Sequence, residues 1–488
     1  MEHINTQIAI IGSGACGLAC GLTTAAAGKK TIIFEKMPSC GGMTQCAEGM
    51  FAIGSKYQKQ MKVYLDVESH FLAHMEESRW LANPRLVKRF MDRTADTIDW
   101  LEEQGCLFTG VTTFGPGKPF VWHMLQGSEK GAHGSGSPAA YGLVRPLLER
   151  VNENENIELR LATAVTDLLR DENGRICGLL AKDSDGVEYH VHAQALLIAT
   201  GGYGDRTDWL KEHFPNGEYI NPVSPGGQDG DGQEMAWKHG AAKDGMGVAQ
   251  IFMLVPDEPM DSALMQAGLQ PNLWINKKGI RYCNEEIVYD FPMCVNALCE
   301  QPEATAYNIM DIEMMMELEE QGIKYTLGEY FVPGSKLKGL AQVLKNGIRS
   351  GKVIAANTLE ELAEKMNIDS EQLQKTVDEY NSCCEKNWDF VFGKKRMYLH
   401  SIKKPPYFSV IIKPVLGITE GGIKINENME VLTELQDVIP GLYAGGCAAG
   451  GVVGNSYITV TSGGSLSFAV NSGRIAGENM LHYLETSC

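Results

Sequence analysis

A strand, a glycine-rich turn and a helix near the N-terminus constrain the fold of this chain more than any other stretch. The apolar run Ile8–Ile11 is typical of a buried parallel strand, and it leads directly into Gly12-Ser-Gly14-Ala-Cys-Gly17. In this pattern Gly12 makes the tight turn, Gly14 lets the backbone approach a pyrophosphate, and Gly17 permits close packing of helix on strand. The pyrophosphate would bind at the helix N-terminus, whose free N–H groups and dipole favour an anion.

A second predicted strand, Lys30–Phe34, follows the helix expected over residues 18–28 and ends in Glu35. A carboxylate at this point is placed to accept hydrogen bonds from a ribose diol. A glycine loop alone would also fit an ordinary turn. Strand, loop, helix, strand and acid in this order instead predict a Rossmann-like dinucleotide-binding domain.

Composition limits the partners of the chain. Its 488 residues, 44% of them apolar, are typical of a globular protein too long for one simple core. The net charge of −18 argues against nucleic acid or an anionic membrane surface as a partner, because both favour basic patches. We expect a cytoplasmic protein, since neither a basic leader nor a run of about 20 apolar residues occurs. The cysteines lack the spacing of zinc or haem sites, so no metal is predicted.

The remaining chain indicates a second domain inserted in the first. Four strands between residues 158 and 193 are predicted to form a meander that leads to the buried strand ending in Ala199-Thr-Gly-Gly202. Residues 248–412 lose the parallel-strand pattern, whereas the last part returns to strand, glycine turn and small-residue helix. We therefore predict an α/β fold in which residues 1–247 and 413–488 form the Rossmann-like domain and residues 248–412 form an α+β insertion.

Two glycine-rich segments are further candidates for ligand contact. The pair Gly41-Gly42 either lies against a bound cofactor or makes a plain turn. The long loop Gly127–Ser137 is expected to approach a ligand or to be mobile. A helix N-terminus near Gly464 could face the ring system of a cofactor.

Taken together, these motifs resemble the flavoprotein subunits of the fumarate reductase and succinate dehydrogenase superfamily. The resemblance also covers Gly230-Asp-Gly232, Gly279-Ile-Arg-Tyr-Cys-Asn-Glu285, Gly421-Gly422, Pro440–Ala444 and Gly473–Gly477, in this order. It implies an FAD-binding domain with an inserted capping domain and a substrate pocket beside the flavin. It also implies FAD contacts at Gly12, Gly14, Ala15, Gly17, Glu35, Lys36, Gly41, Gly42, Met43, Thr44, Ala164, Thr200, Gly201, Gly202, Asp231, Gly446, Cys447, Ser465 and Leu466.

Two departures from the family concern the cofactor. Non-covalent FAD is expected, because no histidine follows Gly42 where flavin-attaching members carry one. The acidic residue that members carry after Leu-Tyr-Ala falls at Cys447.

Other departures concern the substrate. The arginines and histidines with which fumarate-reducing members bind a dicarboxylate fall at Tyr289, Tyr457, Phe252 and Gly417 or Ile418. Because a carboxylate needs charge-assisted donors, we predict that the protein is not a dicarboxylate reductase. Similar 3-ketosteroid Δ1-dehydrogenases carry tyrosines at the positions of Tyr289 and Tyr457.

A phenol can pass a proton to or from carbon without requiring an anionic substrate. We therefore predict an FAD-dependent reductase that passes hydride from flavin N5 to an activated carbon of a neutral cyclic or aromatic substrate. Tyr289 is expected to donate the proton and Tyr457 to orient an oxygen. His123, Trp122, Phe252, Gly417 and Ile418 would shape the pocket, His123 with a part in catalysis. The alternative for both tyrosines is simple packing.

Several alternatives remain open. The substrate could be a steroid enone, or a phenolic or flavonoid compound that undergoes C=C reduction or reductive loss of a hydroxyl, as in tetrahydrodaidzein reductase-like members. The reverse reaction, desaturation of a 3-ketosteroid, is one rival, and a non-catalytic flavin electron carrier or sensor is another. Electrons would come from NAD(P)H or from a separate donor, because no second dinucleotide fingerprint, iron–sulfur spacing or haem motif occurs.

Overall fold

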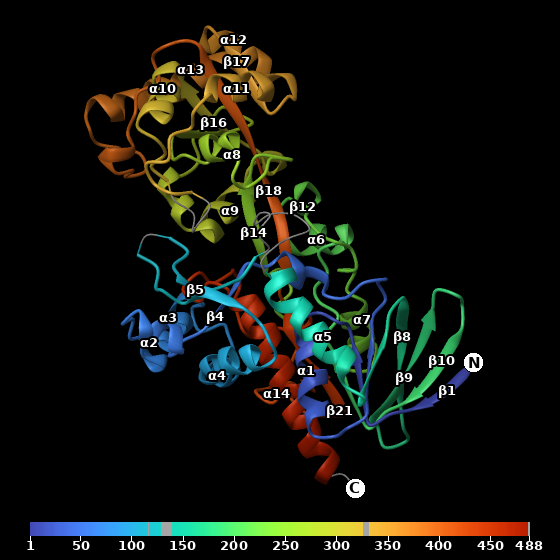
Figure 1. The fold of residues 1–488 in the computed structure, drawn as a ribbon. Coiled ribbons are helices and arrows are strands. Elements are labelled where there is room, and N and C mark those ends of the chain that lie inside the picture. Colours follow the sequence, from blue (N-terminus) through green and yellow to red (C-terminus); the bar gives the residue numbers. More distant parts are fainter. Residues whose placement is uncertain (116, 128–138, 326–330, 487–488) are drawn as a thin grey trace.

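The N-terminal fingerprint folds into the centre of a six-stranded sheet. The computed structural model describes residues 1–115, 117–127, 139–325 and 331–486 (Figure 1). In spatial order, the strands are β20 (Glu430–Leu432), β21 (Val438–Ala444), β11 (Ala195–Ile198), β2 (Ile8–Ile11), β3 (Thr31–Phe34) and β7 (Ile157–Arg160). β2 pairs in parallel with β3 and β11, and all its residues are buried, as a central parallel strand requires.

Two helices from opposite ends of the chain pack against each other beside this sheet. α1 (Ala15–Ala26) follows the glycine turn, and α14 (Gly464–Thr486) ends the described chain. A Cβ atom at Gly473 would lie 2.2 Å from the Cys16 carbonyl oxygen, so this approach requires glycine. The last part of the chain therefore completes the nucleotide-binding fold, as predicted.

A second sheet of four strands extends from this fold. Its order is β1 (Glu2–Asn5), β10 (Glu188–His192), β9 (Ile176–Asp183) and β8 (Thr163–Arg170). The predicted meander is wrong at its first strand, because β7 pairs with β3 in the six-stranded sheet. The helix α5 (Arg145–Glu153) precedes β7 and brings it to the free edge of β3.

The inserted part is built on the 13-residue strand β18 (Tyr407–Thr419), which connects it to the nucleotide-binding fold in Figure 1. β18 pairs with β12 (Asn221–Pro222), β14 (Ala249–Leu254), β16 (Ala306–Asp311) and β17 (Val353–Ala356), and β16 also pairs with β15 (Leu273–Asn276). Around them lie α8 (Ala263–Gly268), α9 (Phe291–Cys299), α10 (Ile312–Glu320), α11 (Leu340–Arg349), α12 (Leu359–Met366) and α13 (Ser370–Glu385). The α/β class with an inserted α+β part is confirmed, whereas the domain limits stay a prediction.

Smaller elements complete the fold. They are the sheet of β4 (Gly49–Phe51), β6 (Trp122–Leu125) and β5 (Phe108–Thr112), the pair of β13 (Lys243–Asp244) with β19 (Gly422–Ile423), and the helices α2 (Lys56–Gln60), α3 (Val67–Glu77), α4 (Pro84–Glu103), α6 (Thr207–His213) and α7 (Asp231–Lys238). Residues 128–137 of the predicted glycine-rich loop lie outside the described residues. None of the described helices combines the length and apolar character needed to cross a bilayer.

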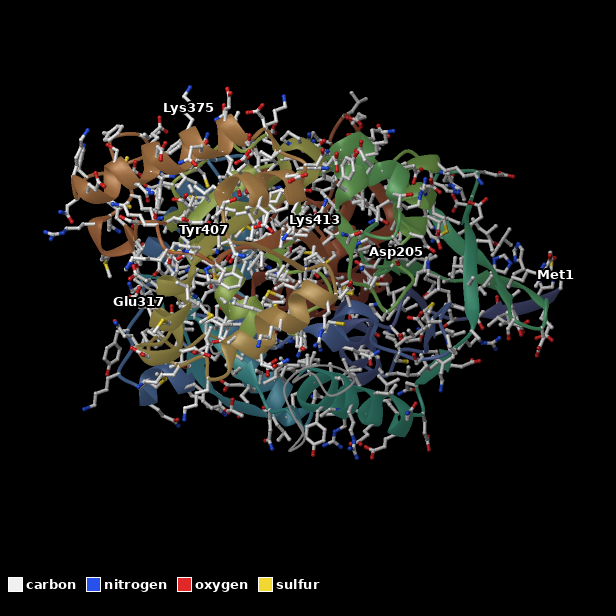
Figure 2. All side chains as sticks on the ribbon, turned by 90° about the horizontal axis from the view of Figure 1, so that it is seen from above. Met1, Asp205, Glu317, Lys375, Tyr407 and Lys413 are labelled. Carbon is white, nitrogen blue, oxygen red and sulfur yellow. The ribbon has the colours of Figure 1, made fainter. Side chains whose placement is uncertain are left out.

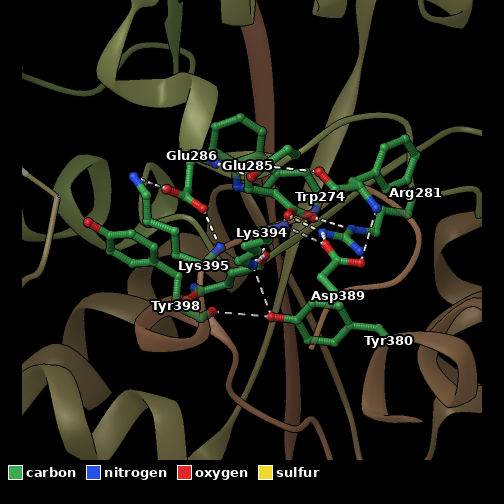
Figure 3. A network of polar contacts seen from close by, with 12 residues as sticks. Trp274, Arg281, Glu285, Glu286, Tyr380, Asp389, Lys394, Lys395 and Tyr398 are labelled. Atoms are coloured by element: carbon green, nitrogen blue, oxygen red, sulfur yellow. Dashed lines mark hydrogen bonds and ion pairs between the residues drawn. The ribbon is translucent and has the colours of Figure 1, made fainter. Parts of the chain in front are cut away.

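A buried network of charges orders the inserted part around the motif Gly279–Glu285 (Figure 3). The Arg281 guanidinium donates to Glu285 at 2.9 and 2.8 Å and to Asp389 at 2.7 Å. The fully buried Lys394 ammonium lies 3.2 Å from Glu285 and donates to the Tyr380 hydroxyl at 3.0 Å. The motif is therefore accounted for by a structural network in which buried charges pair with one another, although Nη1 of Arg281 has no partner among the described residues.

Candidate active site

A cavity of about 510 Å³ lies at the carboxyl ends of the parallel strands, next to the inserted part. Gly12 to Cys16 follow β2, Glu35 to Met37 follow β3, and Ala199 to Gly202 follow β11, and all of these residues line it. Open α/β sheets bind their ligands at this edge. The opposite lining comes from β14, from the start of α9 and from the loop before α14.

The glycines of the fingerprint have two different roles. A Cβ atom at Gly17 would lie 2.0 Å from the Gly12 carbonyl oxygen, so Gly17 serves packing. Gly14 has an extended backbone (φ −70°), and its Cβ would make only an ordinary contact, 3.5 Å from Thr44 Oγ1. At Gly201 nothing lies within 4 Å. Gly14 and Gly201 therefore present bare backbone to space that a cofactor can fill.

The acid of the fingerprint is held in place by the loop that it faces. Glu35 Oε2 accepts hydrogen bonds from the Ser13 amide at 3.0 Å and the Ser13 hydroxyl at 2.6 Å, and Oε1 accepts from the Met37 amide at 2.9 Å. Next to it, the Lys36 ammonium pairs with Asp229 and, at 2.9 Å, with Asp231. A fixed carboxylate beside a helix N-terminus fits the ribose and pyrophosphate of FAD.

Two buried polar atoms at the cavity lack partners within the described structure. They are the Thr200 hydroxyl oxygen and the Gln228 amide nitrogen, and both residues line the cavity. Buried polar groups without partners are rare in folded proteins. Together with the glycine cradle, they fit a ligand that offers several hydroxyl and phosphate groups, as FAD does.

Most of the predicted cofactor positions line this cavity. They are Gly12, Gly14, Ala15, Glu35, Lys36, Gly41, Gly42, Met43, Thr44, Thr200, Gly201, Gly202, Asp231, Gly446, Cys447, Ser465 and Leu466. Gly17 and Ala164 do not. Alternate residues of β8 face opposite sides of the sheet, so Thr163 and Val165 line the cavity and Ala164 between them does not.

Aromatic side chains form one wall of the cavity. The Phe291 ring lies 5.1 Å from the rings of Phe114 and Phe252 and 5.5 Å from that of Tyr457, measured between centroids. The Trp122 ring lies 5.8 Å from Phe114. All five residues line the cavity, so Trp122, Phe252 and Tyr457, which were expected in the substrate pocket, lie in one place. Gly417 and Ile418 also line it.

The described lining of the large cavity contains no cationic side chain that lacks an acidic partner. Lys36 is the one cation there, and Asp229 and Asp231 neutralise it; the described lining contains no arginine or histidine. A dicarboxylate needs such groups as partners. Beside the cradle that fits FAD, the described lining therefore suits a neutral aromatic substrate better than an anionic one.

Tyr457 places a phenol in this cavity. Its hydroxyl accepts hydrogen bonds from the Ser465 hydroxyl at 3.2 Å and from the Gln250 amide at 3.5 Å. Burial, together with the nearby Glu420 carboxyl, raises the pKa of Tyr457 above its usual value. Tyr457 is therefore protonated at neutral pH and can give up a proton to a substrate atom.

Tyr289, the predicted proton donor, does not line the cavity. Its hydroxyl lies 2.7 Å from the Tyr398 hydroxyl and donates to the Lys324 carbonyl at 3.2 Å. The short turn Glu285–Tyr289 ends at Asp290, which caps α9, and the next residue, Phe291, faces the cavity instead. Tyr289 was expected beside the substrate, but the start of α9 turns its side chain away from the cavity.

His123 is also placed away from the cavity. Its Nδ1 lies 3.0 Å from the Val121 carbonyl oxygen and its Nε2 lies 2.6 Å from the Ser55 hydroxyl. Since a carbonyl oxygen only accepts, Nδ1 carries the proton and Nε2 accepts from Ser55. Burial lowers the pKa of His123 to about 4, so the ring is neutral and fully engaged by protein. Alternation along β6 places Trp122 at the cavity and His123 on the other face.

Some lining residues were missed by the sequence interpretation. Gln250, Phe252 and Leu254 of β14 all face the cavity, but only Phe252 was expected. The two-residue period of a strand could have indicated the other two. Phe114 and Phe291 lie in segments without a motif, so no sequence signal marks them.

The fold and the cavity together define an FAD-dependent oxidoreductase of fumarate reductase-like fold. A model of the FAD binding domain family matches residues 7–459, and the chain belongs to this family. It is 30% identical to the vinyl phenol reductase of Lactiplantibacillus plantarum, over 99% of this chain and 97% of that protein. It is 27% identical to a fumarate reductase (cytochrome) of Shewanella frigidimarina, over 99% and 78% of the two chains.

Among solved structures, the 3-ketosteroid-Δ4-(5α)-dehydrogenase of Rhodococcus jostii RHA1 in complex with 4-androstene-3,17-dione has the same fold. The TM-score is 0.75 at 22% identity, over 98% of this chain and 97% of that one. The predicted resemblance to fumarate reductase-like flavoproteins is therefore confirmed.

Proposed function

We propose that the protein reduces the C=C bond of a small neutral phenolic alkene. The observation that carries this proposal is the aromatic wall around Tyr457, with no free cation among the described lining residues. The similarity to a vinyl phenol reductase supports the phenolic class. FAD, bound non-covalently, would supply the hydride equivalent, and NAD(P)H or a separate donor would supply the two electrons.

The residues of the chain would bind and protonate the substrate. The rings of Phe114, Phe252 and Phe291 would hold a phenolic ring by offset or edge contacts. Tyr457 would give its proton to the terminal vinyl carbon, which leaves the benzylic carbon as the hydride acceptor because the phenolic oxygen stabilises positive charge there. One proton and one hydride equivalent convert the vinyl group to an ethyl group.

Tyr289 is the alternative acid. It could act only if its hydroxyl left Tyr398 and the turn before α9 moved toward the cavity. Tyr457 lines the cavity and its raised pKa keeps it protonated, and both observations support Tyr457 as the proposed proton donor.

A steroid enone is the second candidate substrate. It is favoured by the pair of Tyr457 and Gln250, which could hold a ketone oxygen, and by the fold shared with a steroid dehydrogenase. A carboxylate substrate has no comparable support.

A binding experiment tests the substrate class. The absorbance of the bound flavin would be followed while oxidised protein is titrated with 4-ethylphenol, with a ketosteroid or with succinate. We expect a saturable spectral change with the phenol and none with succinate. A change with succinate alone would overturn the proposal.

A further inference from the structure

Behind Tyr457 lies a buried glutamate that the reaction described above does not use. Glu420 directly follows β18, and its Oε2 is buried without a hydrogen-bond partner in the described part of the chain. Glu420, Cys447, Tyr457 and Ser465 line a second cavity of about 20 Å³. This volume is enough for about one water molecule. Glu420 does not line the large cavity, so it would reach the substrate only through Tyr457.

The surroundings of Glu420 favour its protonated form. Burial raises the pKa of this carboxyl to about 7, although a hydrogen bond with Ser465 lowers it. The other titratable groups at the small cavity are Tyr457 and Cys447, and its lining contains no lysine, arginine or histidine.

Three titratable residues of neighbouring elements contact the loop residues 445–452, which run along the small cavity. Asp244 of β13 contacts Gly450 and Gly451, His74 of α3 bonds the Val452 carbonyl at 2.7 Å, and Cys16 of α1 contacts Gly445 and Gly446. Burial lowers the pKa of His74 to about 4 and raises that of Asp244, so both favour their neutral forms.

A path of hydroxyl groups connects the carboxyl to the active-site phenol. The Ser465 and Tyr457 hydroxyl oxygens lie 3.2 Å apart, and Ser465 lies in the first turn of α14. We propose that Glu420 returns a proton to Tyr457 through Ser465 or a water molecule after each turnover. This inference rests on the proposed function.

The proton balance is simple. Tyr457 loses its proton to the substrate carbon and becomes a phenolate; the Glu420 carboxylic acid then reprotonates it and takes a new proton from solvent. The transfer is downhill because a carboxylic acid is a stronger acid than a phenol. No electron moves in this step.

The variant Glu420→Gln should affect the first turnover and the later turnovers differently. Tyr457 carries its own proton at the start, so one reoxidation of photoreduced flavin by 4-vinylphenol should stay within about twofold of the wild-type rate. The multiple-turnover rate should fall at least tenfold. In wild type this rate should decline as pH rises through about 7, because Glu420 then loses the proton it transfers; the glutamine variant should lack this decline.

Two further variants complete the design. Glu420→Asp keeps the acid and should retain the pH dependence, so it serves if the glutamine variant does not fold with flavin. Glu172→Gln, at an exposed turn, is the matched control and should behave as wild type. Equal multiple-turnover rates and pH profiles in wild type and Glu420→Gln would overturn this inference alone. No reoxidation of wild-type flavin by the alkene would overturn the proposed function, and this inference with it.

A separate observation concerns the far end of the molecule, where Met1 lies in Figure 2. His3 of β1 lies opposite His190 of β10, and His192 follows two residues later on the same face. One ring nitrogen of each histidine lies within 4.8 Å of the others. His190 Nδ1 is buried and has no partner among the described residues.

We infer that these three histidines form a binding site for a divalent transition metal of the zinc class. Zinc–nitrogen bonds of about 2.0–2.1 Å require small ring rotations, which the exposed rings of His3 and His192 can make, and water would complete the coordination. A bound ion would link β1 to β10 at the edge of the sheet. This site is independent of the proposed reaction.

Thermal unfolding with and without ZnCl2 tests the site. Zinc should raise the unfolding temperature of wild type by at least about 2 °C, because only the folded chain brings these three histidines together. His190→Asn should lose this rise, whereas His482→Asn, an exposed histidine on α14, should keep it. An equal rise in wild type and His190→Asn would overturn the site and point to cysteine ligation.

Discussion

The hydroxyl groups of Tyr289 and Tyr398 lie 2.7 Å apart, and this hydrogen bond holds the Tyr289 phenol within the inserted part of the chain. Tyr457 instead lines the cavity, in contact with Phe291. We therefore predict that Tyr457→Phe lowers turnover by about 10²–10⁴-fold, the usual contribution of a general acid. Tyr289→Phe should change turnover by less than about threefold. Steady-state rates of both variants at equal flavin content measure this, and the reverse order would return the acid role to Tyr289.

Substitutions at Gly14 and Gly17 should distinguish the effects on cofactor binding from those on folding. Gly14→Ala should leave the unfolding temperature of the FAD-free protein within about 2 °C of wild type, since its backbone is extended and the new Cβ makes an ordinary contact. It should nevertheless reduce FAD affinity, because the Cβ enters the space of the pyrophosphate. Gly17→Ala should prevent stable folding through its clash with Gly12. Normal FAD content in Gly14→Ala would contradict the assigned cradle.

The fingerprint could be predicted because its geometry is local. The glycine turn, the start of α1 and Glu35 are linked by contacts within about 25 residues, and a strand–turn–helix pattern specifies them. The orientation of Tyr289 depends on Tyr398, 109 positions later, and on the exact start of α9. No local pattern carries that information. His123 lies away from the cavity for a more local reason, because one residue along β6 exchanges the two faces of the strand.

The network around Arg281 should be essential for stability (Figure 3). Arg281→Ala would leave the buried carboxylates of Glu285 and Asp389 with Lys394 as their remaining cation. We expect a loss of about 3–5 kcal/mol in the free energy of unfolding, typical of breaking a buried ion pair. Arg349→Ala, at an exposed position, should change it by less than about 0.5 kcal/mol. Denaturant unfolding measures both, and equal values would contradict the role of the network.

Buried histidines should make the stability depend on pH. Burial lowers the pKa of His74 from 6.5 to about 4, so between these values the unfolded chain binds more protons and the free energy of unfolding falls as pH falls. Over pH 7 to 5 this amounts to about 2 kcal/mol for one such histidine. His123 acts in the same direction and Glu420 in the opposite one, so a variant must be compared with wild type.

His74→Gln removes one of these groups and can still donate to the Val452 carbonyl. The stability of the variant relative to wild type should therefore improve by about 2 kcal/mol between pH 7 and pH 5. Urea unfolding at both pH values measures the difference. A constant difference would show that His74 titrates normally in the folded protein.

Anaerobic reoxidation of the photoreduced flavin tests the proposed activity most directly. Reduced protein would be mixed with 4-vinylphenol or with fumarate, and the recovery of oxidised flavin absorbance would be recorded together with the product. The aromatic cavity without a free cation among its described residues predicts rapid reoxidation and 4-ethylphenol with the phenolic alkene, and no reaction with fumarate. Reoxidation by fumarate and none by the phenolic alkene would contradict the assignment.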